Sequence, residues 1–476
     1  MAIQWSGLGP GVLLTLDRAA GQGLRSQLED GLRDAIRTGR LHVGERLPSS
    51  RELARELGIS RGLVQECYEQ LQAEGYLVSQ VGSATRVASS AYPAPAPATE
   101  PAPPPAAPPR PRLLADFRSG TPDLASFPRG DWAWATREAC RTVASADMDY
   151  GDPRGNAAFR DVLAAYLRRV RAAAADPARI VVCTGYAQGL GLVLRVLHRS
   201  GARCVAFEDP GPGHVETSES IRTARAVGLR VAHVPVDDHG LDVQALAASG
   251  ADVVVVTPAH QSPTGVVLAP HRRHALVEWA DRNDAFVIED DYDSEFRYDR
   301  EPVGAVQGLA SDHVFLIGTT SKSLAPAIRL GWILAPARLA GALAEEKLIS
   351  DRGTSVLDQL VVATLLQSGR YDRHLRRMRV TYAGRRDALA AALAEHAPHV
   401  KLTGLAAGFH AVAHLPDDTD EPAVVAAALR RSVGLYGMSL SRADGATTPP
   451  QLVLGFGNVG ERAIGPGIGA VADLLR

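Results

Sequence analysis

Apolar positions near the N-terminus recur with helical spacing. Leu24, Leu28, Leu32 and Ile36 lie four residues apart and predict one amphipathic helix. Two shorter helical patterns follow, one from Ser50 to the stop at Gly58 and one from the cap at Ser60 to Gly75. Residues 77–81 and 84–87 then predict a hairpin around Gly82-Ser83. A helix, a helix-turn-helix and a two-stranded wing are a layout typical of DNA-binding domains.

The pattern changes abruptly after the predicted wing. From about residue 89 to residue 112 the chain is mostly proline and alanine, with almost no side chain able to build a core. Such tracts favour polyproline II and act as semi-rigid spacers. We therefore predict a DNA-binding domain at 12–88, a linker at 89–112 and a second domain at 113–476.

Short apolar runs alternate with helical patterns in the second domain. This alternation predicts an α/β fold with a doubly wound, mostly parallel sheet, whose chemistry lies at the carboxyl ends of the strands. From about residue 335 the chain is richer in helices, which predicts a smaller α+β lobe at 335–476. The clearest strands are residues 180–183, 204–207, 253–257, 286–289 and 314–317, with short strands near 409–413 and 452–455 in the lobe.

Composition narrows the class of protein. No apolar run approaches the roughly 18 residues that a membrane span needs, and no export signal is recognisable, so we expect a cytoplasmic protein without a membrane partner. The four cysteines are widely spaced, which predicts small core residues and no metal site. The formal net charge is only −2, so a DNA-binding prediction depends on where the charges lie.

Charge placement in the first domain favours DNA. Arg51 follows the cap of the second helix and Arg61 lies in the first turn of the third, where backbone N–H groups also face phosphates. A single exposed arginine is most often simply solvated, so the prediction depends on the combination. The residues that we predict to contact a double-stranded DNA operator are Ser49, Arg51, Arg61, Thr85 and Arg86.

Two segments of this domain carry a family signature. Residues 39–54, GRLHVGERLPSSRELA, and residues 57–61, LGISR, resemble the GntR family of winged-helix regulators. The resemblance covers essentially residues 20–88. Gly62 stands where that family more often has threonine or asparagine, and Ala84 departs slightly from the usual wing.

Lys322 stands out in the second domain because only three of the 51 basic residues are lysines. It follows the apolar run at 314–317, at a predicted strand end. A lysine amine can condense with an aldehyde, whereas arginine stays protonated. Taken alone, a surface lysine in a turn is the more ordinary interpretation, and the neighbouring motifs decide between the two.

Those motifs resemble the fold-type I aminotransferases, which bind pyridoxal 5′-phosphate. They are the Lys322 segment at 318–329 and the segments YGDPRG at 150–155, VTPAHQSPTG at 256–265 and EDDYDSEFRY at 289–298. Joined to a GntR-type head by a long linker, they resemble the MocR-type subfamily of GntR regulators. This resemblance spans nearly the whole chain and implies a large domain with a small C-terminal lobe.

The resemblance also implies roles for single residues. Lys322 would condense with the cofactor aldehyde, Asp290 would keep the pyridine nitrogen protonated, and Tyr292 would hydrogen-bond the ring oxygen. Tyr150 matches a residue that reaches the phosphate of the other subunit, which implies a homodimer. Arg442 is the candidate for holding a substrate carboxylate. The phosphate would be bound by Arg329, Thr319 and Ser321, with Gly185 and Tyr186 in the phosphate loop.

Three functions remain open from the sequence. The first is a transcription regulator that senses pyridoxal 5′-phosphate, an amino acid or an amine and alters operator binding. The second is a catalytically active aminotransferase carrying a DNA-binding head. It is disfavoured because Ser262 replaces an asparagine, Pro212 replaces a stacking aromatic residue and Tyr186 alters the phosphate loop. The third is a vestigial dimerisation scaffold, which the joint presence of Lys322, Asp290, Tyr292 and Arg329 argues against.

Overall fold

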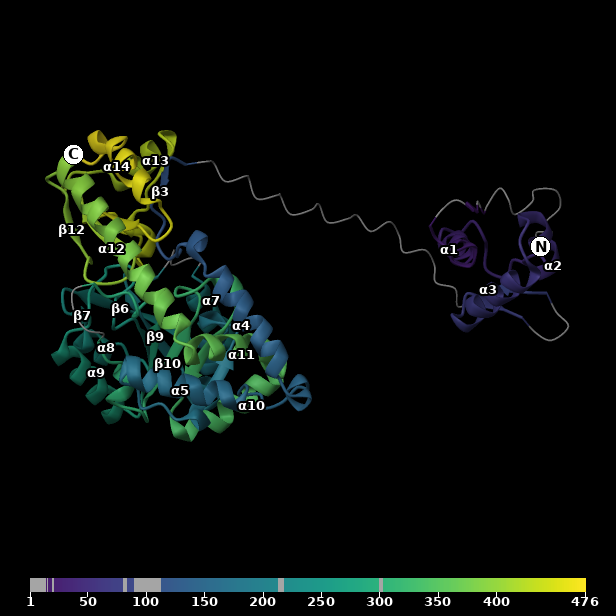
Figure 1. The fold of residues 1–476 in the computed structure, drawn as a ribbon, viewed down its shortest axis with the longest axis horizontal. Coiled ribbons are helices and arrows are strands. Elements are labelled where there is room, and N and C mark those ends of the chain that lie inside the picture. The colour runs from purple at the N-terminus through teal and green to yellow at the C-terminus, as the bar shows by residue number, and fades with distance from the viewer. Residues whose placement is uncertain are drawn as a thin grey trace. The chain divides into compact units, whose positions relative to one another are not determined.

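The computed structural model describes residues 14, 16–18, 21–79, 84–89, 113–212, 218–298 and 303–476. The chain divides into two compact units, Met1–Arg110 and Pro111–Arg476, each of which is described by itself (Figure 1). The predicted hairpin tip at Gly82-Ser83 and residues 90–112 of the predicted linker lie outside the described residues.

The first unit is a helix, a helix-turn-helix and a wing, as its pattern predicts. Its strands pair antiparallel, and Leu47 N–H and Val87 N–H add hydrogen bonds that join residues 45–47 to the wing. Leu28, Val64 and Leu71 are fully buried at the centre of one apolar core. The elements are α1 (Leu24–Arg37), α2 (Ser50–Leu57), α3 (Arg61–Ala73), β1 (Leu77–Val78) and β2 (Arg86–Val87).

The second unit is built on an eight-stranded sheet in the order β4-β11-β10-β9-β8-β5-β6-β7. β11 and β7 run antiparallel to their neighbours, and the other pairs are parallel, which confirms the doubly wound α/β prediction. The strands are β4 (Ile180–Cys183), β5 (Cys204–Asp209), β6 (Arg230–Asp237), β7 (Gly240–Leu241), β8 (Val253–Val256), β9 (Phe286–Asp291), β10 (Val314–Thr319) and β11 (Gly331–Leu334).

Helices cover both faces of this sheet. Alternate residues of β4 pack into different hydrophobic cores. Ile180 and Val182 face the core on one side of the sheet, and Val181 and Cys183 face the core on the other. The first core includes residues of α4 (Arg129–Thr142), α5 (Ala157–Arg171), α11 (Val356–Gln367) and α12 (Arg370–His396), and the second those of α6 (Tyr186–Arg199), α7 (Glu219–Val227) and α10 (Ala337–Asp351). A further core forms around α8 (Val243–Ala248) and α9 (Pro270–Arg282).

The C-terminal lobe contains the antiparallel sheet β12-β13-β15 and two helices. β3, from the beginning of the unit, pairs with β14 of the lobe, whereas α10 and α11 pack against α6, α4 and α5. The lobe expected from residue 335 is therefore not one continuous stretch of chain. Its elements are β3 (Ala115–Asp116), β12 (Lys401–Thr403), β13 (His410–His414), α13 (Glu421–Arg430), β14 (Val433–Gly434), β15 (Gln451–Gly455) and α14 (Glu461–Gly469).

The structure shows how far the four cysteines are buried and how long and apolar the helices are. Cys67, Cys183 and Cys204 are buried as expected, but Cys140 is exposed, so the prediction of a core role is wrong for that residue. None of the helices in the described ranges is both long and apolar enough to span a bilayer.

Candidate functional site

The first candidate site is the start of α2 and α3 in the winged unit. Ser49 and Glu52 form a reciprocal cap, because Glu52 N–H donates to Ser49 Oγ at 3.3 Å and Ser49 N–H donates to Glu52 Oε2 at 3.0 Å. The Ser60 hydroxyl oxygen caps α3 in a similar way, accepting from Leu63 N–H at 3.3 Å. These caps fix where the two helices begin, and therefore where Arg51 and Arg61 are presented.

The candidate DNA-contacting residues of this unit differ in their surroundings. Arg51 and Arg61 are exposed, and their guanidinium groups make no hydrogen bond or ion pair to the part of the chain that is described. Arg86 already makes a hydrogen bond within the unit, from its Nη1 to Gly44 O at 2.9 Å. Thr85 precedes it in the chain. Arg46 is exposed on the segment that bridges to Arg86 and was not singled out from the sequence.

The second candidate site surrounds Lys322 at the carboxyl end of β10. Lys322 is partly buried, and its Nζ donates to Gly120 O at 2.6 Å. Burial lowers the pKa of the Lys322 amine, while the nearby Asp290 and Asp293 carboxylates act in the opposite direction. A lowered pKa increases the fraction of neutral, nucleophilic amine near neutral pH.

Asp290 lies on β9, the strand adjacent to β10, in register with Ile317. Its Oδ1 is buried and has no hydrogen-bond partner in the structure. Burial raises the pKa of Asp290 well above its usual range, and the positive charge of Lys322 opposes that rise. A buried carboxylate oxygen without a partner is suited to receive a proton or a cationic N–H from a bound molecule.

Tyr292 follows β9 and is held by a histidine that the sequence analysis did not identify. Its hydroxyl donates to His260 O at 2.9 Å and lies 3.2 Å from His260 Nδ1. His260 Nδ1 is also 2.8 Å from Asp293 Oδ2, and the His410 ring lies 4.5 Å away between centroids. His260, Asp293 and His410 are at most 2 % exposed, and burial lowers the pKa of His410 well below its usual range.

A small polar cradle is formed where β10, β11 and the start of α6 meet. A Cβ on Gly185, whose φ is +114°, would lie 3.6 Å from Arg329 Nη1 and 3.8 Å from Thr319 Oγ1. Thr319 Oγ1 and Ser321 Oγ are 2.8 Å apart. Hydroxyl groups, an arginine and the N-terminus of a 14-residue helix make a suitable environment for a phosphate group.

Tyr186 and Pro212 line one hollow together with Asp290. Burial raises the pKa of the Tyr186 phenol. In the same hollow, Glu208 Oε2 accepts from Thr257 Oγ1 at 2.6 Å, and burial raises the pKa of Glu208 to about 7. Glu208 was not predicted as a site residue, because it lies 49 residues from Thr257, its hydrogen-bond partner.

The two remaining candidates lie elsewhere in the unit. Tyr150 is 70 % exposed, and the Arg352 guanidinium lies 4.9 Å from the centre of its ring. Arg442 uses its donors within its own loop, to Ala446 O at 2.7 Å, Pro449 O at 2.8 Å and Gln451 Oε1 at 2.7 Å. These contacts occupy donors that a substrate carboxylate would need, so the role of Arg442 stays a prediction.

Comparisons with known proteins agree with this two-part organisation. A family model described as bacterial regulatory proteins, gntR family, matches residues 24–87, and one described as aminotransferase class I and II matches residues 116–442. The pyridoxine biosynthesis transcriptional regulator PdxR of Corynebacterium glutamicum is 33 % identical over 94 % of this chain and 95 % of its own length. The probable rhizopine catabolism regulatory protein MocR of Rhizobium meliloti is 31 % identical over 96 % of this chain and 95 % of its own.

A solved structure gives the same fold for the second unit. The kynurenine aminotransferase of Pyrococcus horikoshii superposes with a TM-score of 0.68 at 26 % identity, covering 77 % of this chain and 91 % of that protein. The chain therefore belongs to the helix-turn-helix transcriptional regulators that join a GntR-type head to an aminotransferase class I and II domain, the MocR-type group. It is a transcription regulator, and its GntR-type head implies binding to DNA.

Proposed function

We propose that this regulator binds pyridoxal 5′-phosphate at Lys322 and that occupancy of the site changes how the winged-helix heads bind an operator. When bound, the cofactor supplies an electrophilic aldehyde and an electron-withdrawing ring. Lys322 would provide the amine for the aldehyde, and Asp290 would hold a proton at the ring nitrogen. The Tyr292 hydroxyl would donate to the ring oxygen in place of its hydrogen bond to His260 O. Arg329, Thr319 and Ser321 bind the phosphate, together with the N–H groups that begin α6.

The observation that carries this proposal is the convergence of three unlike groups at one end of the sheet. A partly buried amine with a lowered pKa, a buried carboxylate oxygen without a partner and a polar cradle suited to phosphate all lie at the ends of β9 and β10 or at the start of α6. Each matches one part of the cofactor: the aldehyde, the ring nitrogen and the phosphate. The backbone of Gly185 has a φ of +114°, a conformation that other residues rarely adopt, which is why the cradle needs a glycine there.

We further propose that the second unit forms a homodimer through the surface around Tyr150. Met148 and Tyr150 are 61 % and 70 % exposed, and they line a hollow with Asp351, Arg352 and Gly353. A second copy would cover these apolar side chains and bring Tyr150 to the partner's cofactor phosphate. Two heads on one dimer then fit two half-sites of an operator.

The effector that we favour is the cofactor itself. The relative in Corynebacterium glutamicum carries pyridoxine biosynthesis in its name, and we extend that to this chain as a proposal. A ligand changes operator binding only if it binds one arrangement of heads and body more tightly than another, and the coupling then acts equally in both directions. An amino acid or amine that reacts at Lys322 would act through the same equilibrium.

The proposal is tested by titrating the full-length protein with DNA from upstream of its own gene, with and without pyridoxal 5′-phosphate. We expect the Kd for this DNA to change at least tenfold when the cofactor is present. Lys322→Ala should abolish the change, whereas Lys401→Ala, at an exposed lysine, should retain it. An unchanged Kd in the wild-type protein would refute cofactor sensing. Sustained turnover of amino-acid and keto-acid pairs would favour the aminotransferase alternative.

A further inference from the structure

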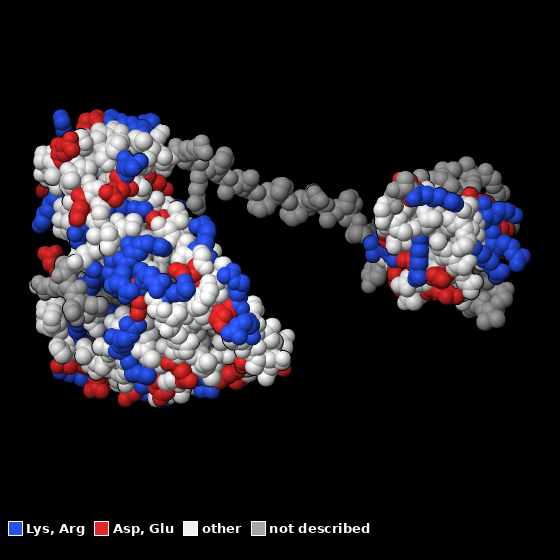
Figure 2. Space-filling model, viewed as in Figure 1, with Lys and Arg blue, Asp and Glu red and all other residues white. Residues whose placement is uncertain are grey.

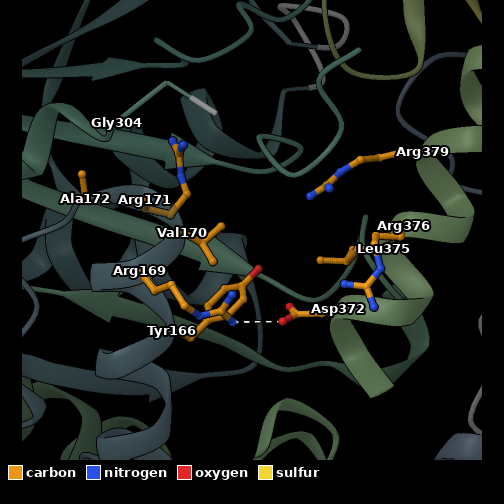
Figure 3. Close-up of a pocket in the computed structure, with 10 residues that line it drawn as sticks. All are labelled: Tyr166, Arg169, Val170, Arg171, Ala172, Gly304, Asp372, Leu375, Arg376 and Arg379. Carbon is orange, nitrogen blue, oxygen red and sulfur yellow. Dashed lines mark hydrogen bonds and ion pairs between the residues drawn. The ribbon is translucent and has the colours of Figure 1, made fainter. Parts of the chain in front are cut away.

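A second pocket lies between α5 and α12, away from the candidate cofactor site. It has a volume of about 350 Å³ and shares no lining residue with that site. Basic side chains gather on the face of this unit that carries α12 (Figure 2). The lining residues are Tyr166, Arg169, Val170, Arg171, Ala172, Gly304, Asp372, Leu375, Arg376 and Arg379 (Figure 3).

The side chains that line this pocket include four arginines and one carboxylate, so the lining carries more positive than negative charge. Asp372, the carboxylate of the lining, is paired with Arg169 at 3.1 Å. Arg171 is paired with Asp291 at 2.7 Å, outside the lining. Arg376 has no side-chain hydrogen bond or ion pair to the described part of the chain, and Arg379 has only the hydrogen bond from its Nε to Glu295 O at 2.6 Å. Among the described residues, these two guanidinium groups therefore have no carboxylate within ion-pair distance.

Side chains from α5 and α12 line the pocket on two sides. Arg379 and Arg376 extend from α12 toward the space, and Arg169 faces them from α5 beside the Tyr166 ring (Figure 3). The hydrogen bond to Glu295 O anchors the base of Arg379 and leaves its two terminal amino groups to a ligand. Planar guanidinium groups bind phosphate oxygens through paired N–H donors, which a fixed arrangement favours.

We propose that this pocket binds a small phosphate-bearing molecule, either inorganic phosphate or a phosphomonoester. A phosphate dianion matches the two uncompensated guanidinium groups, and Arg169 supplies a third donor. Val170 and Leu375 give the lining an apolar part that suits the organic portion of an ester. The volume is that of a small-molecule site, and the arginines surround a hollow instead of forming a ridge that would follow a DNA backbone.

Isothermal titration of the full-length protein with inorganic phosphate and with glycerol 3-phosphate tests this site. We expect Arg376→Ala to weaken binding at least tenfold and Arg376→Lys to weaken it less, because lysine keeps the charge but loses the paired donors. Arg373→Ala is the matched control, since Arg373 is exposed on the same helix but does not line the pocket, and it should leave the Kd unchanged. Asp372→Asn should tighten binding several-fold by removing the carboxylate that repels phosphate and occupies Arg169.

One further variant separates this pocket from the cofactor site. Arg329→Ala, in the phosphate cradle, should leave this binding intact. Binding that disappears in Arg329→Ala but persists in Arg376→Ala would overturn the proposal, as would equal losses in Arg376→Ala and Arg373→Ala. The proposal also fails if Arg376→Ala weakens DNA binding while phosphate binding is unchanged. Tighter binding of glycerol 3-phosphate than of phosphate would identify an ester as the ligand class, and equal affinities would identify the phosphate group alone.

Discussion

At the scale of single residues, burial sets the chemistry of the candidate cofactor site. Lys322 and Asp290 lie at the ends of adjacent strands, where burial disfavours the charged form of each. Each group also favours ionisation of the other, but burial has the larger effect on both pKa values. A bound cofactor would consume the amine and offer a proton to the carboxylate.

The pH dependence of cofactor capture follows from the lowered pKa of Lys322. Only the neutral amine attacks an aldehyde, so the capture rate should rise with pH and level off above the pKa of this lysine. Because burial lowers that pKa, the midpoint should lie below the midpoint for free N-acetyl-lysine. Stopped-flow absorbance over a pH series measures both.

Asp290→Asn provides the companion test. The Asp290 carboxylate raises the pKa of Lys322, so its removal should move the midpoint of capture to lower pH. A midpoint that equals that of N-acetyl-lysine in the wild-type protein, or that moves upward in the variant, would contradict this electrostatic account.

At the scale of elements, the winged unit depends on how its short helices begin. α2 has only eight residues, too few to be stable without tertiary packing and good caps. The reciprocal hydrogen bonds of Ser49 and Glu52 satisfy N–H groups that the first turn would otherwise leave free. They also explain why the serines at 49 and 50 mark the start of this helix.

Loss of this cap should loosen α2 measurably. Ser49→Ala should lower the local free energy of opening by about 1 kcal/mol, which corresponds to roughly fivefold faster amide exchange. Hydrogen–deuterium exchange of residues 50–57 in the full-length protein measures the effect. Ser50→Ala is the control, because Ser50 is the first helical residue and not the cap. Equal increases in amide exchange in the two variants would show that the Ser49 cap does not stabilise α2.

The strands show which elements can be predicted from the chain. β4, β8 and β10 are buried along their whole length, so each contains a run of four apolar residues that the sequence displays directly. β6 was missed because most of its residues are exposed or half-buried and include His233 and Pro235. β11 is as short as β4 and β8, but it was missed because it begins with Gly331 and directly follows the Lys322 segment.

At the scale of the whole molecule, charge placement on the heads should determine the salt dependence of DNA binding. Arg61→Ala removes one exposed guanidinium at the start of α3. We expect the plot of log K against log salt concentration to become less steep by about one unit, as for the loss of one phosphate contact. Fluorescence anisotropy at several salt concentrations measures the slope. Arg225→Ala, at an exposed arginine of α7, should leave it unchanged.

The proposed dimer can be tested in the same full-length protein. Met148→Glu places a charge in the exposed apolar surface around Tyr150 and should shift the protein toward monomer in sedimentation velocity experiments. Val43→Glu makes the same change at a 59 % exposed valine of the winged unit and should leave the assembly intact. A wild-type protein that sediments as a monomer at all concentrations would exclude the dimer.

The sequence by itself determined the local features of this protein. Helical periodicity, serine caps and apolar runs depend on neighbouring residues, so they predicted the winged head, the doubly wound sheet and the position of Lys322. Only the tertiary structure decided which distant residues meet. The Lys322 contact to Gly120 spans 202 positions, and His260, Asp293 and His410 come from three separate segments. The arginine-lined pocket arises in the same way, because α5 and α12 are far apart in the chain and only packing brings their charges together.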